Sequence, residues 1–169
     1  VMMRKKLFEE YGGYPENGPE DFGLWLHWQQ QGVRFEKIPE MLLYWRDHPH
    51  RLSRTGIDYS PEAFARVKAG AAAFIIDKYA SGKAVILCGA GQEAWRKMKI
   101  WEANGIAFHG YSDVKMRQRP FPYHPPESIS PQSGLYYISL LNGRGKASEM
   151  RRFFEDKGLL PDHDFLIAS

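Results

Sequence analysis

The sequence predicts an α/β protein in which a largely helical N-terminal part precedes a small domain with a parallel sheet. The main observation is an alternation of short apolar runs with helix-like segments beyond residue 82, the runs lying at 84–88, 106–112, 135–140 and 165–168. Alternating strands and helices are typical of parallel sheets with right-handed crossovers. The run Ala84–Cys88 is apolar throughout, which indicates a strand that is covered on both faces.

The helices of this domain are predicted from their flanking glycines. One begins after Gly89-Ala90-Gly91 and ends at Gly105, and another covers residues 146–157 and ends at Gly158. A proline-rich loop over 119–131 separates the second strand from the third.

The composition favours a folded chain without a nucleic-acid partner. Hydrophobic residues make up 43% and aromatic residues 14% of the 169 residues, which is enough for a core. The 23 basic and 20 acidic residues give a net charge of +3 and are spread along the chain, whereas nucleic-acid binders carry a dense basic stripe. The single cysteine, Cys88, cannot form an internal disulfide, and no apolar run approaches the roughly 20 residues of a membrane span. We therefore expect a cytoplasmic protein with a buried, unreactive Cys88.

Two helices are predicted in the N-terminal part. The first covers residues 2–11 and ends at Gly12-Gly13, a pair suited to positive φ. The second covers residues 20–31, where apolar side chains repeat at helical spacing. Trp25 and Trp28 lie on this helix, and we expect them in the core rather than as platforms that stack on a sugar.

Less regular structure is predicted after the second helix. Residues 33–38 and 41–45 have the pattern of two short strands separated by Pro39. Residues 46–59 are polar and show no periodicity, so they are predicted to form a loop.

A third helix has a well-marked start. Ser60 can cap it, Pro61 suits the first helical position, and the helix is predicted to end at about Tyr79. We interpret this helix as a connector, which gives an N-terminal part over 1–58, a connecting segment over 59–82 and a sheet domain over 83–169.

A glycine motif follows the first strand of the sheet domain. Gly89-Ala90-Gly91-Gln92-Glu93-Ala94 fits the Gly-x-Gly-x-x-Ala pattern, in which Gly89 permits a tight turn and Gly91 lets a phosphate approach the helix N-terminus. Asp113 lies 22 residues after Gly91, where an acid often binds a ribose hydroxyl in dinucleotide sites. Arg144, between two glycines after the third strand, can also contact a phosphate. Gly89, Gly91 and Asp113 are therefore candidates for binding a nucleotide ligand.

The sheet domain is too short for a complete dinucleotide-binding domain, because residues 83–169 hold only one mononucleotide half. His109 and His124 have no supporting catalytic constellation. The domain resembles the Rossmann-like domain appended to some family 2 glycosyltransferases, and the N-terminal domain of bacterial sugar acyltransferases, which binds nucleotide-sugar. Ligand binding and a structural or interaction role both remain open here, and an enzymatic reaction is the least favoured.

A second set of motifs lies in the N-terminal part. Gly12-Gly13-Tyr14 is followed by Glu20-Asp21, which opens a helix with Leu24-Trp25, and then by Arg46-Asp47-His48. This order resembles the C-terminal part of the catalytic domain of bacterial family 2 glycosyltransferases, which have the GT-A fold. The resemblance covers residues 3–54 and implies a partial GT-A segment of helices and short strands.

The resemblance implies roles for three residues. Asp21 matches the carboxylate that acts as general base on the acceptor hydroxyl, Glu20 helps to hold the acceptor, and His48 matches a histidine that ligates a divalent metal, Mg²⁺ or Mn²⁺. The implied partners are a nucleotide-sugar donor and a glycan acceptor, with a location at the inner face of the cell membrane as one option. Judged without this context, Asp21 is more typical of a first-turn acid and His48 of a surface loop.

One expected motif is missing. The family's donor site contains an Asp-x-Asp that holds metal and nucleotide, and the only match here is Asp162-His163-Asp164, which precedes a predicted strand and is interpreted as a turn. We therefore expect a fragment of an inverting glycosyltransferase that is inactive alone. The alternatives are a non-catalytic nucleotide- or nucleotide-sugar-binding module and, least favoured, the remnant of an NAD(P)-dependent oxidoreductase. Oligomerisation is left open.

Overall fold

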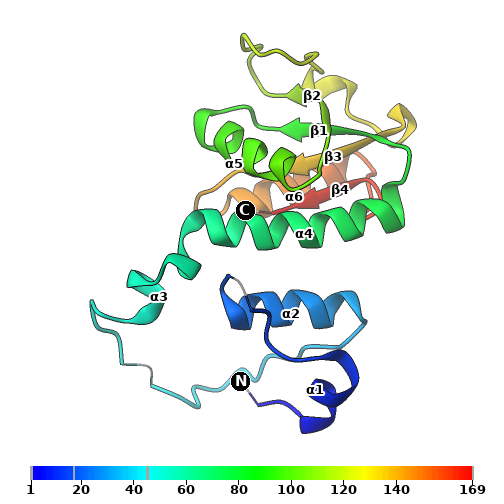
Figure 1. The fold of residues 1–169 in the computed structure, drawn as a ribbon. Helices are drawn as coiled ribbons and strands as arrows, with labels where there is room; N and C mark the ends of the chain where they lie inside the picture. The colour runs from blue at the N-terminus through cyan, green and yellow to red at the C-terminus, as the bar shows by residue number, and fades with distance from the viewer. Residues whose placement is uncertain (1, 17, 45, 169) are drawn as a thin grey trace. The chain divides into compact units, whose positions relative to one another are not determined.

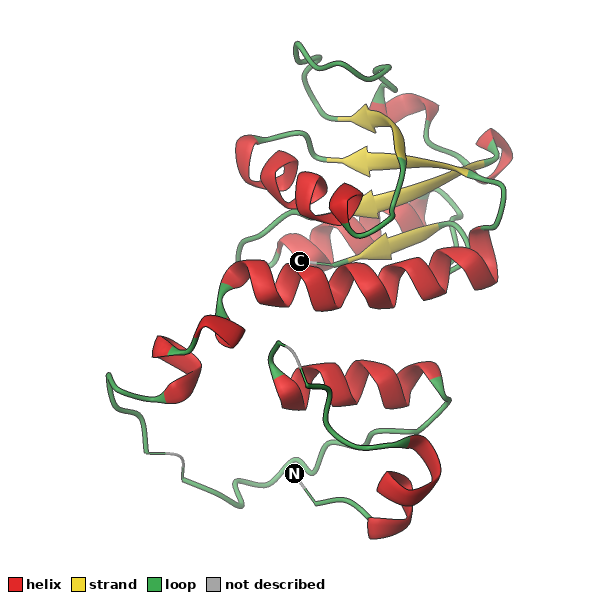
Figure 2. Cartoon of the chain, viewed as in Figure 1, coloured by secondary structure: helices red, strands yellow, loops and turns green. Residues whose placement is uncertain are grey.

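The computed structural model describes residues 2–16, 18–44 and 46–168. The chain divides into two compact units, residues 1–67 and 68–169, and each is described by itself. Figure 1 shows the order of the elements and Figure 2 their types. Helix α4, Pro61–Ala80, begins in the first unit and continues in the second.

The first unit is built around α1, Lys5–Tyr11, and α2, Glu20–Gln30. Trp28 of α2 is 1% exposed, and its indole Nε1–H donates to the carbonyl oxygen of Gly12 at 3.1 Å. The rings of Phe8 and Trp28 pack edge to face. Trp28 is thus a core residue, as predicted, and α1 begins three residues later than predicted but ends at Gly12 with φ +84°.

The prediction of two strands after α2 is wrong for the residues that the structure describes. Residues 33–38 and 41–44 form neither helix nor strand, and Trp45 lies outside the described residues. An apolar run becomes a strand only when another strand pairs with it, and none of the described residues does so here. The large apolar side chains of this segment are at least half exposed: Phe35, Ile38, Met41, Leu42, Leu43 and Tyr44.

The loop predicted over residues 46–59 is also partly wrong. It contains a short helix α3, Leu52–Thr55, and a 3₁₀ turn η1, Ile57–Tyr59. Asp47 accepts hydrogen bonds from the guanidinium groups of Arg51, at 3.2 Å, and Arg54. These partners lie only four and seven residues from Asp47, but the segment has no apolar periodicity, which explains why the sequence indicated a loop.

The start of α4 is as predicted, because the Ser60 hydroxyl oxygen accepts a hydrogen bond from the backbone N–H of Ala63 at 3.2 Å. In the second unit, α4 packs with its small side chains, including the buried Ala69, Ala72 and Ala80. Small side chains let the helix backbone approach the sheet closely.

The second unit is an α/β structure with a parallel sheet, as predicted. Among the described residues, the sheet has the strand order β2-β1-β3-β4. Every pair of neighbouring strands is parallel. The strands are β1 Ala84–Cys88, β2 Phe108–Ser112, β3 Leu135–Ser139 and β4 Phe165–Ile167. The two remaining helices are α5, Gln92–Ala103, and α6, Lys146–Asp156.

Helices cover both faces of this sheet (Figure 2). Val85 and Leu87 of β1 pack with α4 and with Met98 and Trp101 of α5. Ile86 and Cys88, which alternate with them, pack with Phe154 of α6 on the other face. This double coverage explains why β1 is apolar at every position.

Two connections hold further turns. The proline-rich loop contains the 3₁₀ turns η2, Pro126–Ser128, and η3, Pro131–Ser133. Strand β2 begins two residues later than predicted, at Phe108. Among the described residues, no helix is both long and apolar enough to cross a membrane.

Candidate functional site

The order of the strands defines where a ligand can approach the second unit. Strand β1 lies between β2 and β3, so the connections that leave β1 and β3 run to opposite sides of the sheet. In open parallel sheets, such a reversal leaves a crevice outside the carboxyl ends of the strands, and ligands bind there. The glycine motif and Asp113 both follow strands at this edge.

A cavity of about 430 Å³ lies at this carboxyl edge. We call it the carboxyl-edge cavity. It is lined by Cys88, Gly89, Gly91, Ser112, Asp113, Val114, Arg117, Pro126, Ile129, Leu141, Asn142, Lys146, Glu149, Met150 and Phe153. Its volume is at the lower end of the roughly 300–1,000 Å³ of small-molecule sites.

The two glycines of the motif have different roles. Gly89 has φ +86°, and a Cβ atom there would lie 2.5 Å from Cδ2 of Leu141, so the tight turn requires glycine. Gly91 has φ −61° and open space where a Cβ atom would lie. It is the N-cap of α5 and provides no side-chain cap to the first turn of that helix. The open space thus lies beside a helix N-terminus, which attracts anions.

Asp113 holds the glycine turn from the end of β2. Its Oδ2 accepts a hydrogen bond from the backbone N–H of Ala90 at 2.9 Å and another from Nε–H of Arg117 at 2.7 Å. Burial raises the pKa of this carboxyl group, but the hydrogen bonds from Arg117 and Ala90 and the charge of Arg117 outweigh it, so the pKa lies below its usual range. Asp113 therefore braces the turn as an ionised group.

Two arginines fix the loop that follows Asp113. The backbone N–H of Arg117 donates to the hydroxyl oxygen of Tyr111 at 2.9 Å. Arg119 donates through Nη2 to the carbonyl oxygen of Ala90 at 2.8 Å, and its guanidinium carbon lies 4.4 Å from the ring centroid of Trp95. Ala90 is thus held on its N–H by Asp113 and on its carbonyl by Arg119.

A polar chain borders the cavity on the side of α5. Lys97 donates to Asn142, and the Asn142 amide donates to Glu93. Burial lowers the pKa of Lys97, and the charge of Glu93 counteracts this. At the start of α6, Lys146 and Glu149 form an ion pair at 2.6 Å, and both side chains are more than half exposed.

Three small residues form a row at the carboxyl ends of the strands. Cys88 pairs with Ser112 on one side and with Ser139 on the other. Cys88 is 2% exposed, and burial raises the pKa of its thiol, so it is the unreactive buried cysteine that the sequence predicted. Ser139 is 1% exposed, and its hydroxyl group has no hydrogen-bond partner among the described residues.

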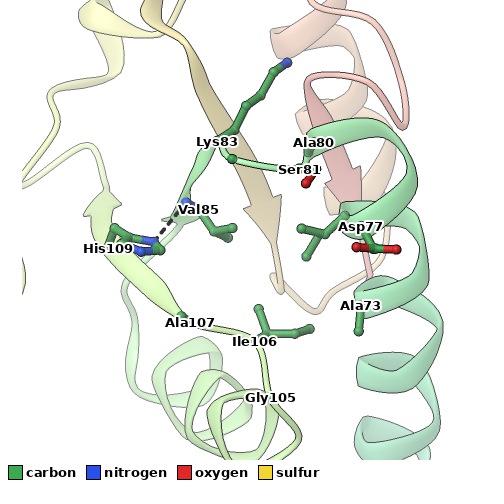
Figure 3. A pocket seen from close by; sticks show the side chains of 12 residues that line it. Ala73, Asp77, Ala80, Ser81, Lys83, Val85, Gly105, Ile106, Ala107 and His109 are labelled. Carbon is green, nitrogen blue, oxygen red and sulfur yellow. Dashed lines mark hydrogen bonds between the residues drawn. The ribbon is translucent and has the colours of Figure 1, made fainter.

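A smaller cavity of about 280 Å³ lies at the opposite end of the sheet, between α4 and the start of β1 and β2 (Figure 3). The ring of His109 turns toward β1, where its Nδ1 accepts a hydrogen bond from the backbone N–H of Val85 at 3.2 Å. The ammonium group of Lys83 points away from the cavity and pairs with Asp164 at 3.0 Å. His109 and Lys83 are thus engaged in holding the fold, and the cavity is the smaller of the two, so it is a weaker candidate than the carboxyl-edge cavity.

In the first unit, Glu20 and Asp21 form the first turn of α2 and are both exposed. Oδ1 of Asp21 accepts a hydrogen bond from the backbone N–H of the adjacent Phe22 at 2.8 Å. Burial and a hydrogen bond to Glu20 raise the pKa of the Tyr59 phenol, so Tyr59 is a neighbour of Glu20 that the sequence did not indicate.

His48 lies in an exposed segment, and its carbonyl oxygen accepts a hydrogen bond from the backbone N–H of Arg51 at 3.3 Å. The adjacent Asp47 is engaged by two arginines. Among the described residues, no group of three or more histidine, cysteine, aspartate or glutamate side chains gathers as a metal site would require. These residues alone do not complete a metal site at His48.

The Asp162-His163-Asp164 segment is the turn that the sequence indicated. Asp162 has φ +64°, and Asp164 accepts a hydrogen bond from the backbone N–H of Leu160 at 3.0 Å. Arg144 is exposed and does not line the carboxyl-edge cavity.

No protein-family model, curated protein or solved structure matches this chain. The structure brings Gly89, Gly91 and Asp113 together around one cavity. The sequence did not indicate its other wall, from Met150 and Phe153 of α6, although their spacing on one face of a predicted helix was a signal.

Proposed function

We propose that the chain supplies the acceptor side of an inverting glycosyltransferase, with a separate ligand-binding domain after it. The observation that carries the first part is the exposed Glu20-Asp21 pair in the first turn of α2, downstream of the Gly12-Gly13 turn. Both carboxylates can reach a ligand from solvent because neither is buried.

In the proposed reaction, a carboxylate oxygen of Asp21 accepts the proton of the acceptor hydroxyl group while the oxygen of that hydroxyl group attacks the anomeric carbon of a nucleotide-sugar. The diphosphate leaves from the opposite face, which inverts the configuration. Glu20 accepts a hydrogen bond from another hydroxyl group of the acceptor and so orients it. A divalent metal would stabilise the leaving diphosphate, but the described residues around His48 do not complete its site, and no step is assigned to it.

An NMR titration of the ¹⁵N-labelled chain with glycan oligosaccharides tests this proposal. We expect shifts of the amide signals of residues 11–23 and weaker acceptor binding in Glu20→Gln. Asp58→Asn, a change of an exposed carboxylate in the same unit, is the matched control and should leave binding unchanged. Amide shifts elsewhere, or binding that Glu20→Gln does not weaken, would contradict the assignment.

The carboxyl-edge cavity favours a second candidate function, in which the second unit is a non-catalytic module that binds a nucleotide or nucleotide-sugar. A ligand that binds only the folded state at 100 times its Kd stabilises that state by about 2.7 kcal/mol. Thermal unfolding with nucleotide-sugars, with NAD(H) and with NADP(H), each with and without Mn²⁺, therefore tests this candidate. A raised midpoint with any of these ligands supports it, and an unchanged midpoint with all of them opposes it.

A further inference from the structure

The lining of the carboxyl-edge cavity combines two kinds of surface. Gly91 leaves open space at the N-terminus of α5, and the cations of Arg117 and Lys146, ion-paired with Asp113 and Glu149, line the same cavity. The lining also includes five apolar side chains: Pro126, Ile129, Leu141, Met150 and Phe153. The helix N-terminus thus suits an anion, and the apolar side chains suit a flat, weakly polar group.

Phe153 and Met150 are available to such a group because both are only partly buried against the α6 side of the core. Ile129, by contrast, is 3% exposed and closes the cavity from the end of the proline-rich loop. An aromatic base packed against Met150 and Phe153 would cover apolar surface that the fold leaves uncovered.

The topology of the sheet fits one nucleotide and not two. Dinucleotides bind across two mononucleotide halves, whereas sheets that begin with the order 2-1-3-4 hold a mononucleotide at the crevice between β1 and β3. The order here is β2-β1-β3-β4, and the cavity contacts residues that follow β1, β2 and β3.

Asp113 uses one of its two carboxylate oxygens to hold the fold, so only the other could serve a ribose. In the usual dinucleotide arrangement, the acid at the end of the second strand accepts hydrogen bonds from a ribose. Here Oδ2 of Asp113 already accepts two hydrogen bonds, from Ala90 at 2.9 Å and from Arg117 at 2.7 Å. A ribose that took these positions would release the glycine turn.

From these observations we infer that the carboxyl-edge cavity binds one nucleoside 5′-phosphate, with the phosphate at Gly91 and the base against Met150 and Phe153. This inference deepens the second candidate function and rests on it. A free nucleotide and a nucleotide-sugar share this chemistry, and a dinucleotide would need a second half-site.

Gly91 allows a direct test because it can be changed without strain. Its φ of −61° is accessible to any residue, and its Cβ position is open, so Gly91→Leu fills the cavity and leaves the turn intact. Gly70→Leu is the matched control, since Gly70 also has an open Cβ position and no positive φ but lies on α4 outside the cavity. Met150→Ala, with Met116→Ala as its exposed control, tests the apolar side independently.

The experiment is calorimetry of the full chain with AMP, UMP, UDP-glucose, NAD⁺, the free nucleosides and inorganic phosphate. We expect one nucleoside 5′-phosphate per chain, with the free nucleoside and phosphate at least about tenfold weaker. Gly91→Leu should weaken binding more than tenfold and Met150→Ala severalfold, with no change in the two controls. Tighter binding of UDP-glucose than of UMP would support the inference and show that the ligand is a nucleotide-sugar rather than a free nucleotide.

Three results would overturn the inference. NAD⁺ binding tenfold tighter than AMP would show a dinucleotide site and leave the second candidate function standing. Nucleotide binding that survives Gly91→Leu unchanged would place the ligand elsewhere. No binding of any probe would remove both the inference and the second candidate function, whereas the proposed acceptor role of Glu20 and Asp21 is tested separately by the glycan titration.

Discussion

Asp113 offers the sharpest test of how the glycine turn is held. Asp113→Ala removes the acceptor of the Ala90 N–H, and Ala90 is 0% exposed in the native fold. A buried donor without a partner costs about 1–3 kcal/mol. The lost ion pair adds no more than about 1 kcal/mol, because Arg117 is 43% exposed and solvent screens the pair. We expect a loss of about 1–4 kcal/mol in the free energy of unfolding at pH 7.

Asp113→Asn separates the hydrogen bond from the charge. The asparagine carbonyl oxygen can still accept from the Ala90 N–H, so this variant should lose only about 1 kcal/mol or less at pH 7. The pKa of Asp113 is lowered in the folded state, so its charge contributes stability above the ordinary pKa of 3.8 and loses it as pH falls through the folded pKa. The gap between the native chain and Asp113→Asn should therefore close below about pH 3.8.

Urea unfolding followed by circular dichroism at pH 7, and at steps down to acid pH, measures both effects. Asp156→Asn, a change of an exposed carboxylate at the end of α6, is the control and should unfold like the native chain. The account of Asp113 as a brace is refuted if Asp113→Ala unfolds within about 0.5 kcal/mol of the native chain. It is also refuted if the difference in the free energy of unfolding between the native chain and Asp113→Asn stays constant as the pH falls.

Three further predictions concern the same edge of the sheet. Gly89→Ala should cost more than about 2 kcal/mol in urea unfolding, because positive φ and contact with Leu141 both oppose a side chain. Gly91→Ala should cost no more than about 1 kcal/mol, the difference between glycine and alanine at an N-cap. Ser139→Ala should cause no loss and up to about 1 kcal/mol of gain, since its buried hydroxyl has no partner among the described residues; a clear loss would contradict this. Cys88 should react with an aromatic disulfide reagent far more slowly in the native chain than in urea, and equal rates would contradict its burial.

The sequence predicted the sheet domain well because each of its signals is local. Strand β1 has the predicted bounds, Ala84–Cys88, since an uninterrupted apolar run between Lys83 and Gly89 fits a strand covered on both faces. The tight turn at Gly89 was likewise predicted from its place after a strand, and Gly89 has φ +86° there. Such signals need no knowledge of distant residues.

The errors arose where a structure depends on distant partners. The strands predicted at 33–38 and 41–45 have the right composition, but a strand forms only when another segment pairs with it. The brace at Asp113 was not predicted because one partner, Ala90, meets it only after β1 and β2 align. The other, Arg117, lies four residues away in a loop without periodicity. The apolar wall from Met150 and Phe153 depends in the same way on how α6 packs against the sheet.

The carboxyl edge of the second unit is the proposed ligand site. The most direct test is an amide NMR titration of the ¹⁵N-labelled chain with UMP and UDP-glucose. We predict shifts of the signals of Gly89, Gly91 and Asn142, with Gly82 and Gly105 at the opposite cavity unchanged. Shifts confined to Gly82 and Gly105, or no shift at all, would contradict the claim.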